Sequence, residues 1–295
     1  MRMEPARQMR ARGAFASVPR GEETIGPLIE ALRHHIARIE RTEGRLDAPR
    51  TRGVPWVMGV DDLDRHLPAS GLARGGLHDV SPALYGDMPA AMGFALALSL
   101  RRMADTSERR PLLWCRLAKE EREYGRLYGH GLERLGLSRR RFVTVTLRKP
   151  VALLWTMEEA LKSGALAVVM GDADGVHADL TATRRLQLAA HAGKSAGLLV
   201  FGRDEALATA SHTRWRVASA SSRSPPHDGL APGAPHWNVE LTRARGGRPG
   251  AWTLEWHHAA HRFSLVPGFR GGTIHPWTDK TGQAAAAQGS ALRAG

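Results

Sequence analysis

The stretch VDDLDRHLPASGLARGGLHDVSPALYGDMPAAMGFALALSL, residues 60–100, decides the fold expected for this 295-residue chain. A Gly-rich approach leads to a short apolar strand at residues 77–80, and a loop follows at residues 81–89. After the loop, apolar side chains such as Met92 and Leu96 recur at the spacing of one helix face. Strand, loop and helix in this order are typical of a nucleotide-binding unit, so the stretch predicts the start of an α/β domain.

The predicted loop has the place of a phosphate-binding loop but not its residues. Such a loop reads G-x-x-x-x-G-K-[ST]; its backbone N–H groups bind phosphate, and its lysine reaches the β and γ oxygens. Here the loop reads SPALYGDMPAA, in which Asp87 and Met88 follow Gly86, and no lysine precedes Lys119. A carboxylate at a helix start repels the phosphates that this position otherwise attracts. We therefore predict the frame of an ATP site without its chemistry.

The middle of the chain alternates apolar strands with helices. Strands are expected at residues 111–117, 142–147, 165–170 and 197–201, and helices at residues 119–135, 151–162 and 180–191. Strands that are apolar throughout are buried on both faces, because helices cover both sides of a parallel sheet. The predicted fold class is α/β, a mostly parallel sheet flanked by helices.

The last third has a different pattern. Residues 214–218, 237–242 and 252–257 alternate apolar and polar side chains, which is typical of antiparallel or edge strands. The turn RARGGRPG, residues 243–250, separates the second and third of these strands. We therefore predict a C-terminal hairpin with arginines at its tip.

Composition changes divide the chain into four segments. Residues 1–22 are expected to form a disordered basic arm, and residues 270–295, rich in Gly, Ala and Gln, a disordered tail. Residues 24–43 have the apolar spacing of an amphipathic helix, so residues 23–54 are expected to be a helix and linker. That helix either packs on its own domain or docks on a neighbour. The α/β domain is expected to span residues 55–269.

The charge of the chain is strongly positive, with a net charge of +13 at pH 7 that comes mainly from arginine. Arginine suits phosphate and carboxylate, so a polyanion or an acidic protein surface is a plausible partner, although a GC-rich genome also favours arginine codons. No run approaches the roughly 20 apolar residues of a membrane span. A single cysteine, Cys115, excludes an internal disulfide and fits a reducing compartment. We expect a cytoplasmic protein with no membrane contact.

The motif order resembles the core of the RecA-type ATPases. Leu63 and Asp64 match that family's Leu-Asp turn, and residues 71–77 (GLARGGL) match its approach to the phosphate loop. The strand that ends VVMGD places an acid where the family has its Walker B aspartate. The resemblance gives these vestigial nucleotide-site positions: Ser81, Pro82, Gly86, Asp87, Met88 and Asp172.

This chain departs from the RecA pattern in two parts of the hydrolytic machinery. The phosphate-loop lysine is missing, and the family's catalytic glutamate falls nearest to Ala118, with Glu120 and Glu121 a few residues late. We therefore expect no enzymatic activity and no cofactor.

A closer resemblance is to the ImuA family, RecA-like accessory proteins of SOS mutagenesis. It is carried by the degenerate phosphate loop and by WNVELTRARGGRPGAWTLEWHHAAHRF, residues 237–263, and covers roughly residues 55–270. The resemblance implies a non-hydrolysing adaptor that helps to assemble a translesion synthesis complex. Its implied partners are ImuB, an error-prone polymerase and RecA, with association to the nucleoid when DNA is damaged.

Arginine clusters are the candidate contacts to DNA or to a partner protein. Phosphate contacts of this kind would be weak, independent of sequence and sensitive to salt. A solvated basic face with internal ion pairs is the equally plausible alternative. The candidate residues are Arg139, Arg140, Arg141, Arg184, Arg185, Arg243, Arg245 and Arg248.

Three smaller motifs are given structural interpretations. Residues 193–195 (Gly-Lys-Ser) lie between a predicted helix and a predicted strand, so we expect a turn. Asp172 and Asp174 end a strand where they could hold Mg²⁺, but a turn cap is the favoured reading. The HHAAH run, residues 257–261, is expected to be a solvated hairpin turn, so no metal site is predicted.

Two other functions remain open from the sequence. One is a divergent DNA-dependent ATPase of RecA fold that uses an unusual lysine such as Lys119. The other is a DNA-binding protein or a modulator of RecA filaments.

Overall fold

The computed structural model describes residues 56–203, 208–222, 224, 229, 231 and 233–266, which belong to one compact unit, Asp47–Gly295. The predicted arm at residues 1–22, the helix and linker at residues 23–54 and the tail at residues 270–295 lie outside the described residues, and those predictions stand untested.

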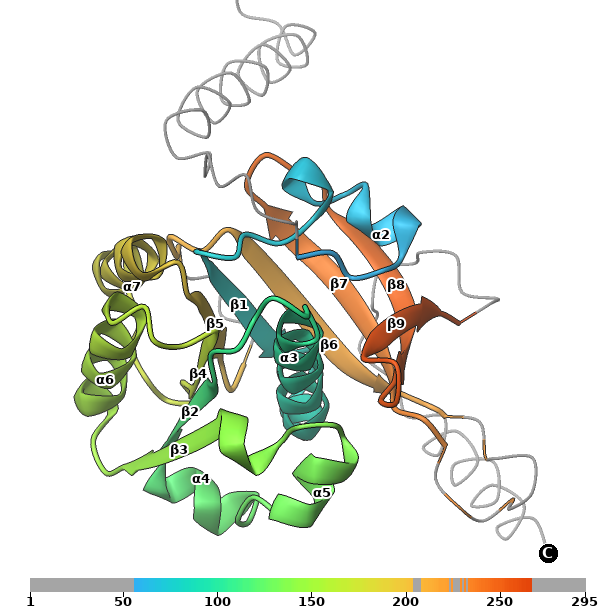
Figure 1. Cartoon of the computed structure of the whole chain (residues 1–295), viewed down its shortest axis with the longest axis horizontal. Coiled ribbons are helices and arrows are strands. Elements are labelled where there is room, and N and C mark those ends of the chain that lie inside the picture. The colour runs from blue at the N-terminus through green and yellow to red at the C-terminus, as the bar shows by residue number, and fades with distance from the viewer. Residues whose placement is uncertain are drawn as a thin grey trace, which may run out of the picture. The chain divides into compact units, whose positions relative to one another are not determined.

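A single nine-stranded sheet organises the described part of the chain (Figure 1). Its order is β3-β2-β4-β5-β1-β6-β7-β8-β9, with parallel pairing from β3 to β6 and antiparallel pairing from β6 to β9. The strands are β1 Leu77–Pro82, β2 Leu112–Leu117, β3 Phe142–Leu147, β4 Val168–Asp172, β5 Ala196–Val200, β6 Thr213–Ala220, β7 His236–Ala244, β8 Gly250–His257 and β9 Arg262–Leu265.

Helices cover both faces of the parallel strands. The longest of the described helices, α3, packs on β1 and β6, whereas α6 and α7 pack against each other on the opposite face (Figure 1). The predicted fold class is therefore confirmed, and the arrangement is consistent with a RecA-like core. The helical segments are α2 Asp61–Asp64, η2 Pro68–Ser70, η3 Tyr85–Asp87, α3 Met88–Met103, α4 Ala118–Glu123, α5 Gly129–Arg134, η4 Arg139–Arg141, α6 Pro150–Lys162 and α7 Leu180–Gly193.

The apolar strands fill two cores, one on each face of the sheet. Along β2, Leu112 and Trp114 join the core beneath α3, while Leu113 and Cys115 join the core beneath α6 and α7. Successive side chains on a strand point to opposite faces, so both faces must be apolar when both are covered. This is why the strands read as continuous apolar runs. Cys115 is buried, as expected for a small hydrophobic residue.

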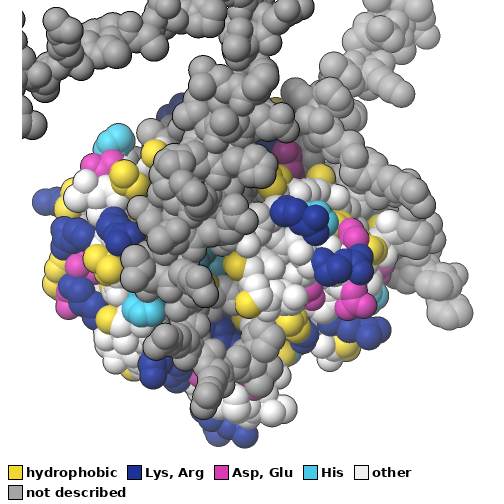
Figure 2. All heavy atoms as spheres, turned by 90° about the horizontal axis from the view of Figure 1, so that it is seen from above, with side chains coloured by type: hydrophobic (Ala, Val, Ile, Leu, Met, Phe, Trp, Pro, Cys, Tyr) yellow, Lys and Arg dark blue, Asp and Glu magenta, His cyan; other side chains and the backbone are white. Residues whose placement is uncertain are grey.

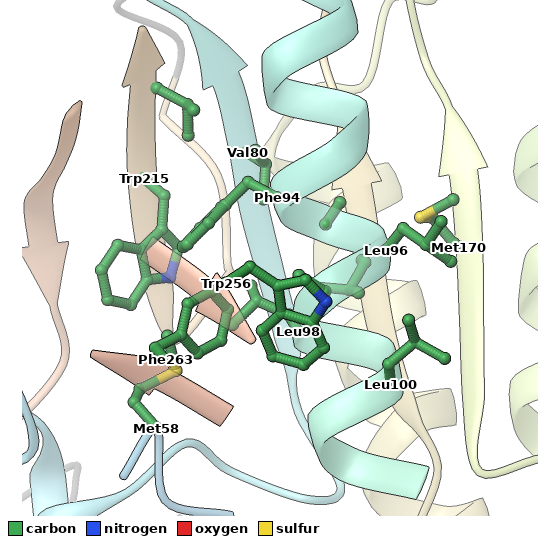
Figure 3. Packing of buried hydrophobic residues seen from close by; sticks show 14 of the residues in the cluster. Met58, Val80, Phe94, Leu96, Leu98, Leu100, Met170, Trp215, Trp256 and Phe263 are labelled. Carbon is green, nitrogen blue, oxygen red and sulfur yellow. The ribbon is translucent and has the colours of Figure 1, made fainter. Parts of the chain in front are cut away.

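The core beneath α3 is aromatic and joins the parallel half of the sheet to the antiparallel half. Figure 3 shows Phe94 of α3 directed at Trp215 of β6, with Phe263 of β9 nearby. The ring centroid of Phe94 lies 5.6 Å from that of Trp215 and 5.8 Å from that of Phe263. Aromatic pairs at such distances add about 1 kcal/mol beyond the burial of their area. Strands from the last third of the chain, β6 and β9, therefore supply part of the core on which α3 packs.

Three predicted elements differ from the structure. The single helix at residues 119–135 is wrong: α4 and α5 are separate short helices, and Gly125 between them has a φ of +78° that ordinary residues rarely adopt. The loop expected from Ser81 starts later, because Ser81 and Pro82 belong to β1. The alternating pattern of β6 predicted an antiparallel or an edge strand: β6 is antiparallel to β7 but also parallel to β1, so it is a central strand and not an edge.

Two other predictions of local structure are confirmed. Strands β7 and β8 form the hairpin, with its arginine-rich turn between Ala244 and Gly250. The Gly-Lys-Ser sequence forms the turn from α7 to β5, with Lys194 in the left-handed region at φ 51°. A side chain at Gly193 would place its Cβ 1.8 Å from the Leu161 carbonyl oxygen of α6, so this position requires glycine for close helix packing.

Candidate functional site

In open α/β sheets, ligands bind where the carboxyl ends of the parallel strands meet. This edge, which we call the carboxyl edge, holds the vestigial nucleotide-site positions in two groups. One group follows β1 and contains Gly86, Asp87 and Met88; the other is Asp172 at the end of β4. Strand β5 lies between β1 and β4, as the strand order requires. The structure thus brings the predicted residues to one edge of the sheet.

The connection from β1 to α3 is too short to wrap around a phosphate. Strand β1 continues through Pro82, which pairs with Val217 of β6, and the next N–H, of Ala83, donates to the Val217 carbonyl at 2.7 Å. The backbone that would begin a phosphate loop is therefore used to extend the sheet. Only Leu84 then separates this segment from the single turn of η3.

Asp87 occupies the loop with an anion that belongs to the protein. One carboxylate oxygen accepts the Leu84 N–H at 3.2 Å, and the other accepts the N–H and the hydroxyl of Ser219 at 2.9 and 2.8 Å. At the start of α3, the Met88 N–H donates to the Tyr85 carbonyl, and Pro89 has no N–H to offer. The Leu84 and Met88 donors are thus bonded internally and Pro89 has none, which leaves fewer donors for a phosphate.

Replacing Asp87 with alanine is expected to lower the free energy of unfolding by about 2 kcal/mol, because the partly buried donors of Leu84 and Ser219 would lose their acceptor. Urea denaturation of the variant and of the parent measures this. An exposed neighbour, Tyr85→Ala, is the control and should change stability by less than about 0.5 kcal/mol. A neutral or stabilising Asp87→Ala would contradict an internal role for this carboxylate.

Asp172 is an internal ion-pair partner, and the expected turn cap at this position is wrong. Its side chain is fully buried and accepts the Trp114 indole N–H at 2.7 Å and the Arg116 Nε–H at 3.1 Å. Arg116 is also buried and donates to the Gly125 carbonyl at 3.3 Å. Burial raises the pKa of Asp172 to about 6, and the two hydrogen bonds limit that rise. Asp172 thus joins β4 to β2 through Arg116 and Trp114.

Lys119 joins two further acids at the same edge. Its Nζ lies 3.3 Å from Glu120 and 3.2 Å from Asp174, which follows β4. Glu120 is fully buried, and burial raises the pKa of its carboxyl although Lys119 opposes the rise. Lys119 follows β2, and β4 and β5 lie between β2 and β1 in the sheet. The lysine therefore contacts the two acids and lies away from the loop after β1.

Among the described residues, hollows open at two places along the carboxyl edge. One, of about 200 Å³, lies at the ends of β4 and β5 and is lined by Asp174, His177, Phe201 and Arg203 among others. It is smaller than the roughly 300–1,000 Å³ of typical ligand pockets. The other, of about 480 Å³, lies at the ends of β2 and β3 and is lined by Leu117, Ala118, Lys119, Arg122, Arg148 and Pro150. We call this second space the basic hollow.

The first predicted arginine cluster lies at the amino ends of the strands, opposite the carboxyl edge. Arg139, Arg140 and Arg141 form η4 just before β3. Arg139 pairs with Glu133 at 2.6 Å, and Arg141 donates to backbone carbonyls, including that of Met103. Arg140 is exposed. The three side chains therefore have different roles and do not form one binding patch.

The hairpin arginines also lie at the amino ends. Arg243 donates to the carbonyls of Thr209 and Ser211, so it braces the start of β6. Arg245 is partly buried, and Arg248 is exposed, with its backbone N–H bonded to the carbonyl of His66. The hairpin tip thus packs toward the segment that precedes β1.

The remaining predicted pair lies on α7 and not in a loop. Arg185 pairs with Glu158 of α6 at 2.6 Å, and Arg184 is exposed beside it. Lys and Arg side chains are dispersed over the face seen in Figure 2, with acidic side chains among them. The structure therefore brings none of the predicted arginine groups together with another at one site.

The HHAAH run lies in the turn from β8 to β9, as predicted. His257 bonds the Ser264 hydroxyl at 2.7 Å, His258 is exposed, and His261 stacks on Trp256 with an interplanar angle of 6°. Three histidines with separate contacts do not form a ligand set.

Sequence reasoning missed the arginines of the basic hollow. Arg122 and Arg148 are 26 positions apart (148 − 122), and neither belongs to an arginine run. They meet because β2 and β3 are parallel neighbours, so the residues that follow each strand emerge side by side. A signal was available in principle: each cation comes within a few residues after a predicted strand.

Comparison with known proteins gives relatives of one kind. The chain is 34% identical over 222 residues to Protein ImuA from two strains of Caulobacter vibrioides, covering 70% of this chain and 87% of each relative. No family model matches. The structure of SulA from Pseudomonas aeruginosa matches with 21% identity and a TM-score of 0.34, covering 42% of this chain and 96% of that one, and we base no conclusion on it. No described helix has the length and apolar character needed to cross a membrane. The identity and coverage of the Caulobacter relatives show that the chain belongs to the ImuA family.

Proposed function

We propose that this chain is a non-hydrolysing accessory protein of SOS-induced mutagenesis, which helps to assemble a translesion synthesis complex with ImuB and an error-prone polymerase and contacts RecA. The role in mutagenesis follows from membership of the ImuA family. The absence of hydrolysis is inferred from one observation: the Asp87 carboxylate accepts the Leu84 N–H of the loop after β1 and the Ser219 N–H of β6. On this view the protein acts in the cytoplasm, and at the nucleoid when DNA is damaged.

The charge arrangement supports an adaptor that does not turn over ATP. A nucleotide would have to displace Asp87 from Leu84 and Ser219 and place its own negative charge beside that carboxylate. The residue directly after Gly86, where a phosphate loop has its lysine, is an aspartate. Asp172, which could otherwise help to hold Mg²⁺, is paired with Arg116. Each of these costs opposes binding, and together they favour use of the fold as a scaffold.

A divergent DNA-dependent ATPase centred on Lys119 is the competing function. Calorimetry with Mg²⁺-ATP, and phosphate release with and without single-stranded DNA, separate the two. We expect neither heat of binding at micromolar protein nor DNA-stimulated turnover. Micromolar binding with stimulated hydrolysis, abolished by Lys119→Ala, would overturn the adaptor proposal.

The partner proposal is tested by co-expression with ImuB and by pull-down with RecA. We expect both proteins to be retained by the full chain, with and without nucleotide. Chains lacking residues 1–43 or residues 270–295 then assign the docking segment, because loss of one partner with one truncation identifies that end. Retention of neither partner by the full chain would contradict the adaptor role. RecA binding without ImuB would favour a modulator of RecA filaments.

A further inference from the structure

In the described part of the chain, the basic hollow is lined by cations and by no acidic residue. The cations are Lys119, Arg122 and Arg148. Lys119 is engaged with Glu120 and Asp174. In contrast, no ion pair or hydrogen bond joins the side chains of Arg122 and Arg148 to any residue in the described part of the chain. Two exposed guanidinium groups at one hollow create a site of positive potential.

No hydrogen bond or ion pair found among the described residues joins these arginines to Glu120, Glu121 or Glu123, the acids of α4. On α4, Glu121 accepts a hydrogen bond from the Thr146 hydroxyl at 2.9 Å and lies 3.9 Å from Arg126. Glu120 points into the protein. Lys149, which follows Arg148, is exposed and adds a further cation at the rim. The hollow is therefore chemically complementary to an anion.

An exposed aromatic surface begins where the hollow ends. Pro150 lines the hollow and starts α6, and Val151 and Trp155, four residues apart, share one side of that helix. Val151 is 80% exposed and Trp155 is 62% exposed. Trp155 lies about 7.5 Å beyond Pro150 along the helix axis. A solvent-exposed indole at this place contributes nothing to the core and is available to a ligand.

We propose that the basic hollow and Trp155 form a binding site for single-stranded DNA. Arg122 and Arg148 bind backbone phosphates, and a base stacks on the Trp155 indole. Arginine pairs with phosphate in a forked geometry, and proteins that bind single strands combine a basic groove with aromatic side chains that accept any base. The apolar floor of Leu117, Ala118 and Pro150 suits the sugar and the base edge. This site is separate from the predicted arginine clusters and extends the proposed accessory function to direct contact with the template strand.

The test uses the full chain and a matched pair of double variants. Arg122→Gln with Arg148→Gln removes two charges at the carboxyl ends of β2 and β3. The control, Arg109→Gln with Arg134→Gln, removes two exposed charges that precede the same two strands and belong to none of the candidate DNA contacts; we call it the amino-end variant. Both variants keep every other arginine, so any background attraction from the rest of the chain cancels in the comparison. Equal urea midpoints would verify that both variants fold.

Binding is measured by fluorescence anisotropy with a labelled oligothymidylate of about 12 nucleotides. At about 50 mM salt the hollow variant should bind at least about tenfold more weakly, and its slope of log affinity against log salt should fall by about 1.4. The amino-end variant should stay within about threefold of the parent. Trp155→Ala should weaken binding about tenfold with an unchanged slope, since stacking releases no counterion.

Photo-crosslinking gives a second readout on the unaltered protein. An oligonucleotide carrying 5-iododeoxyuridine should crosslink to the α6 peptide that contains Trp155. Equal losses in the two double variants, or a crosslink elsewhere, would overturn the proposal. Displacement by ATP at lower concentration than by unlabelled oligonucleotide would assign the site to free nucleotides, and efficient displacement by polyglutamate would assign it to an acidic peptide. Neither result bears on the assays of ATP turnover and partner binding.

Discussion

Asp172→Ala is expected to lower the free energy of unfolding by about 3–5 kcal/mol at pH 7.5, as measured by urea denaturation. The variant leaves the buried Arg116 guanidinium without its carboxylate, and the Trp114 indole N–H without its acceptor. Removing one partner of a buried ion pair costs more than the pair contributes, because the remaining charge stays desolvated. The expected loss is a large fraction of the stability of an ordinary domain.

A double-mutant cycle separates this structural role from a retained functional one. Arg116→Met with Asp172→Leu should recover most of the loss, since neither charge is then buried alone. Asp174→Ala is the matched control on the same edge, and it should cost less than about 1 kcal/mol because its partner Lys119 is about half exposed. An acid kept to hold a metal ion behaves differently. Its removal would be neutral or stabilising, and that outcome for Asp172 would falsify the ion-pair assignment.

His78 is expected to make the protein sensitive to acid. The fully buried imidazole lies between β1 and β6, and burial lowers its pKa to about 4. Its Nε2 bonds the Ala73 carbonyl at 2.9 Å, so this nitrogen carries the proton. Its Nδ1 lies 2.8 Å from the Thr213 hydroxyl, which itself accepts the Trp215 indole N–H. Thr213 therefore donates to Nδ1, and the network has no place for a second proton on the ring.

The sign of the pH effect follows from the lowered pKa. Unfolded His78 binds a proton near pH 6.5, whereas folded His78 does so near pH 4, so the unfolded state holds more protons between these values. The contribution to stability is complete above pH 6.5 and decreases as the pH falls toward 4. The total is about 3 kcal/mol, of which about 2 kcal/mol is lost by pH 5.

Other buried groups titrate as well, so the test is a difference between two proteins. Asp172, with its raised pKa, changes stability in the opposite direction over the same range. This contribution cancels when the parent is compared with His78→Gln across urea titrations from pH 7.5 to 5. The variant should be less stable at pH 7.5, and its deficit should shrink by about 2 kcal/mol at pH 5. His258→Gln, at an exposed turn, should keep the parent's pH dependence. A constant deficit would show that His78 is not responsible.

The parallel half of the fold could be predicted from local pattern. Strands such as Ala196–Val200 are apolar throughout because cores lie on both faces, and period and length are local properties. The status of β6 could not be predicted this way. Its alternation arises because Trp215 and Val217 face the core under α3 while Arg214 and Arg216 face outward, and nothing local distinguishes a half-covered central strand from an edge.

The detailed contacts of the site could not be predicted from the sequence. The position of Asp87 predicts an unfavourable site for phosphate, but its partner Ser219 is 132 residues away, which no local pattern reveals. The same holds for the Asp172–Arg116 pair, formed between neighbouring strands 56 residues apart. Runs of arginine are visible in the sequence and therefore predict candidate contacts. The arginines that share the basic hollow are brought together only by strand order.

The bond between Asp87 and Ser219 has a consequence for how the protein is made. The loop that contains Asp87 cannot form this contact until Ser219 has left the ribosome, which happens 132 residues after Asp87 has left it. At ordinary translation speeds of about 5–20 residues per second, that interval is roughly 7–26 seconds. Until the C-terminal strands have emerged, Phe94 of α3 has no aromatic partners, because Trp215, Trp237 and Phe263 all come late in the chain. The nascent chain therefore presents a hydrophobic helix to chaperones and proteases, so its yield should depend on completion of the C-terminal strands.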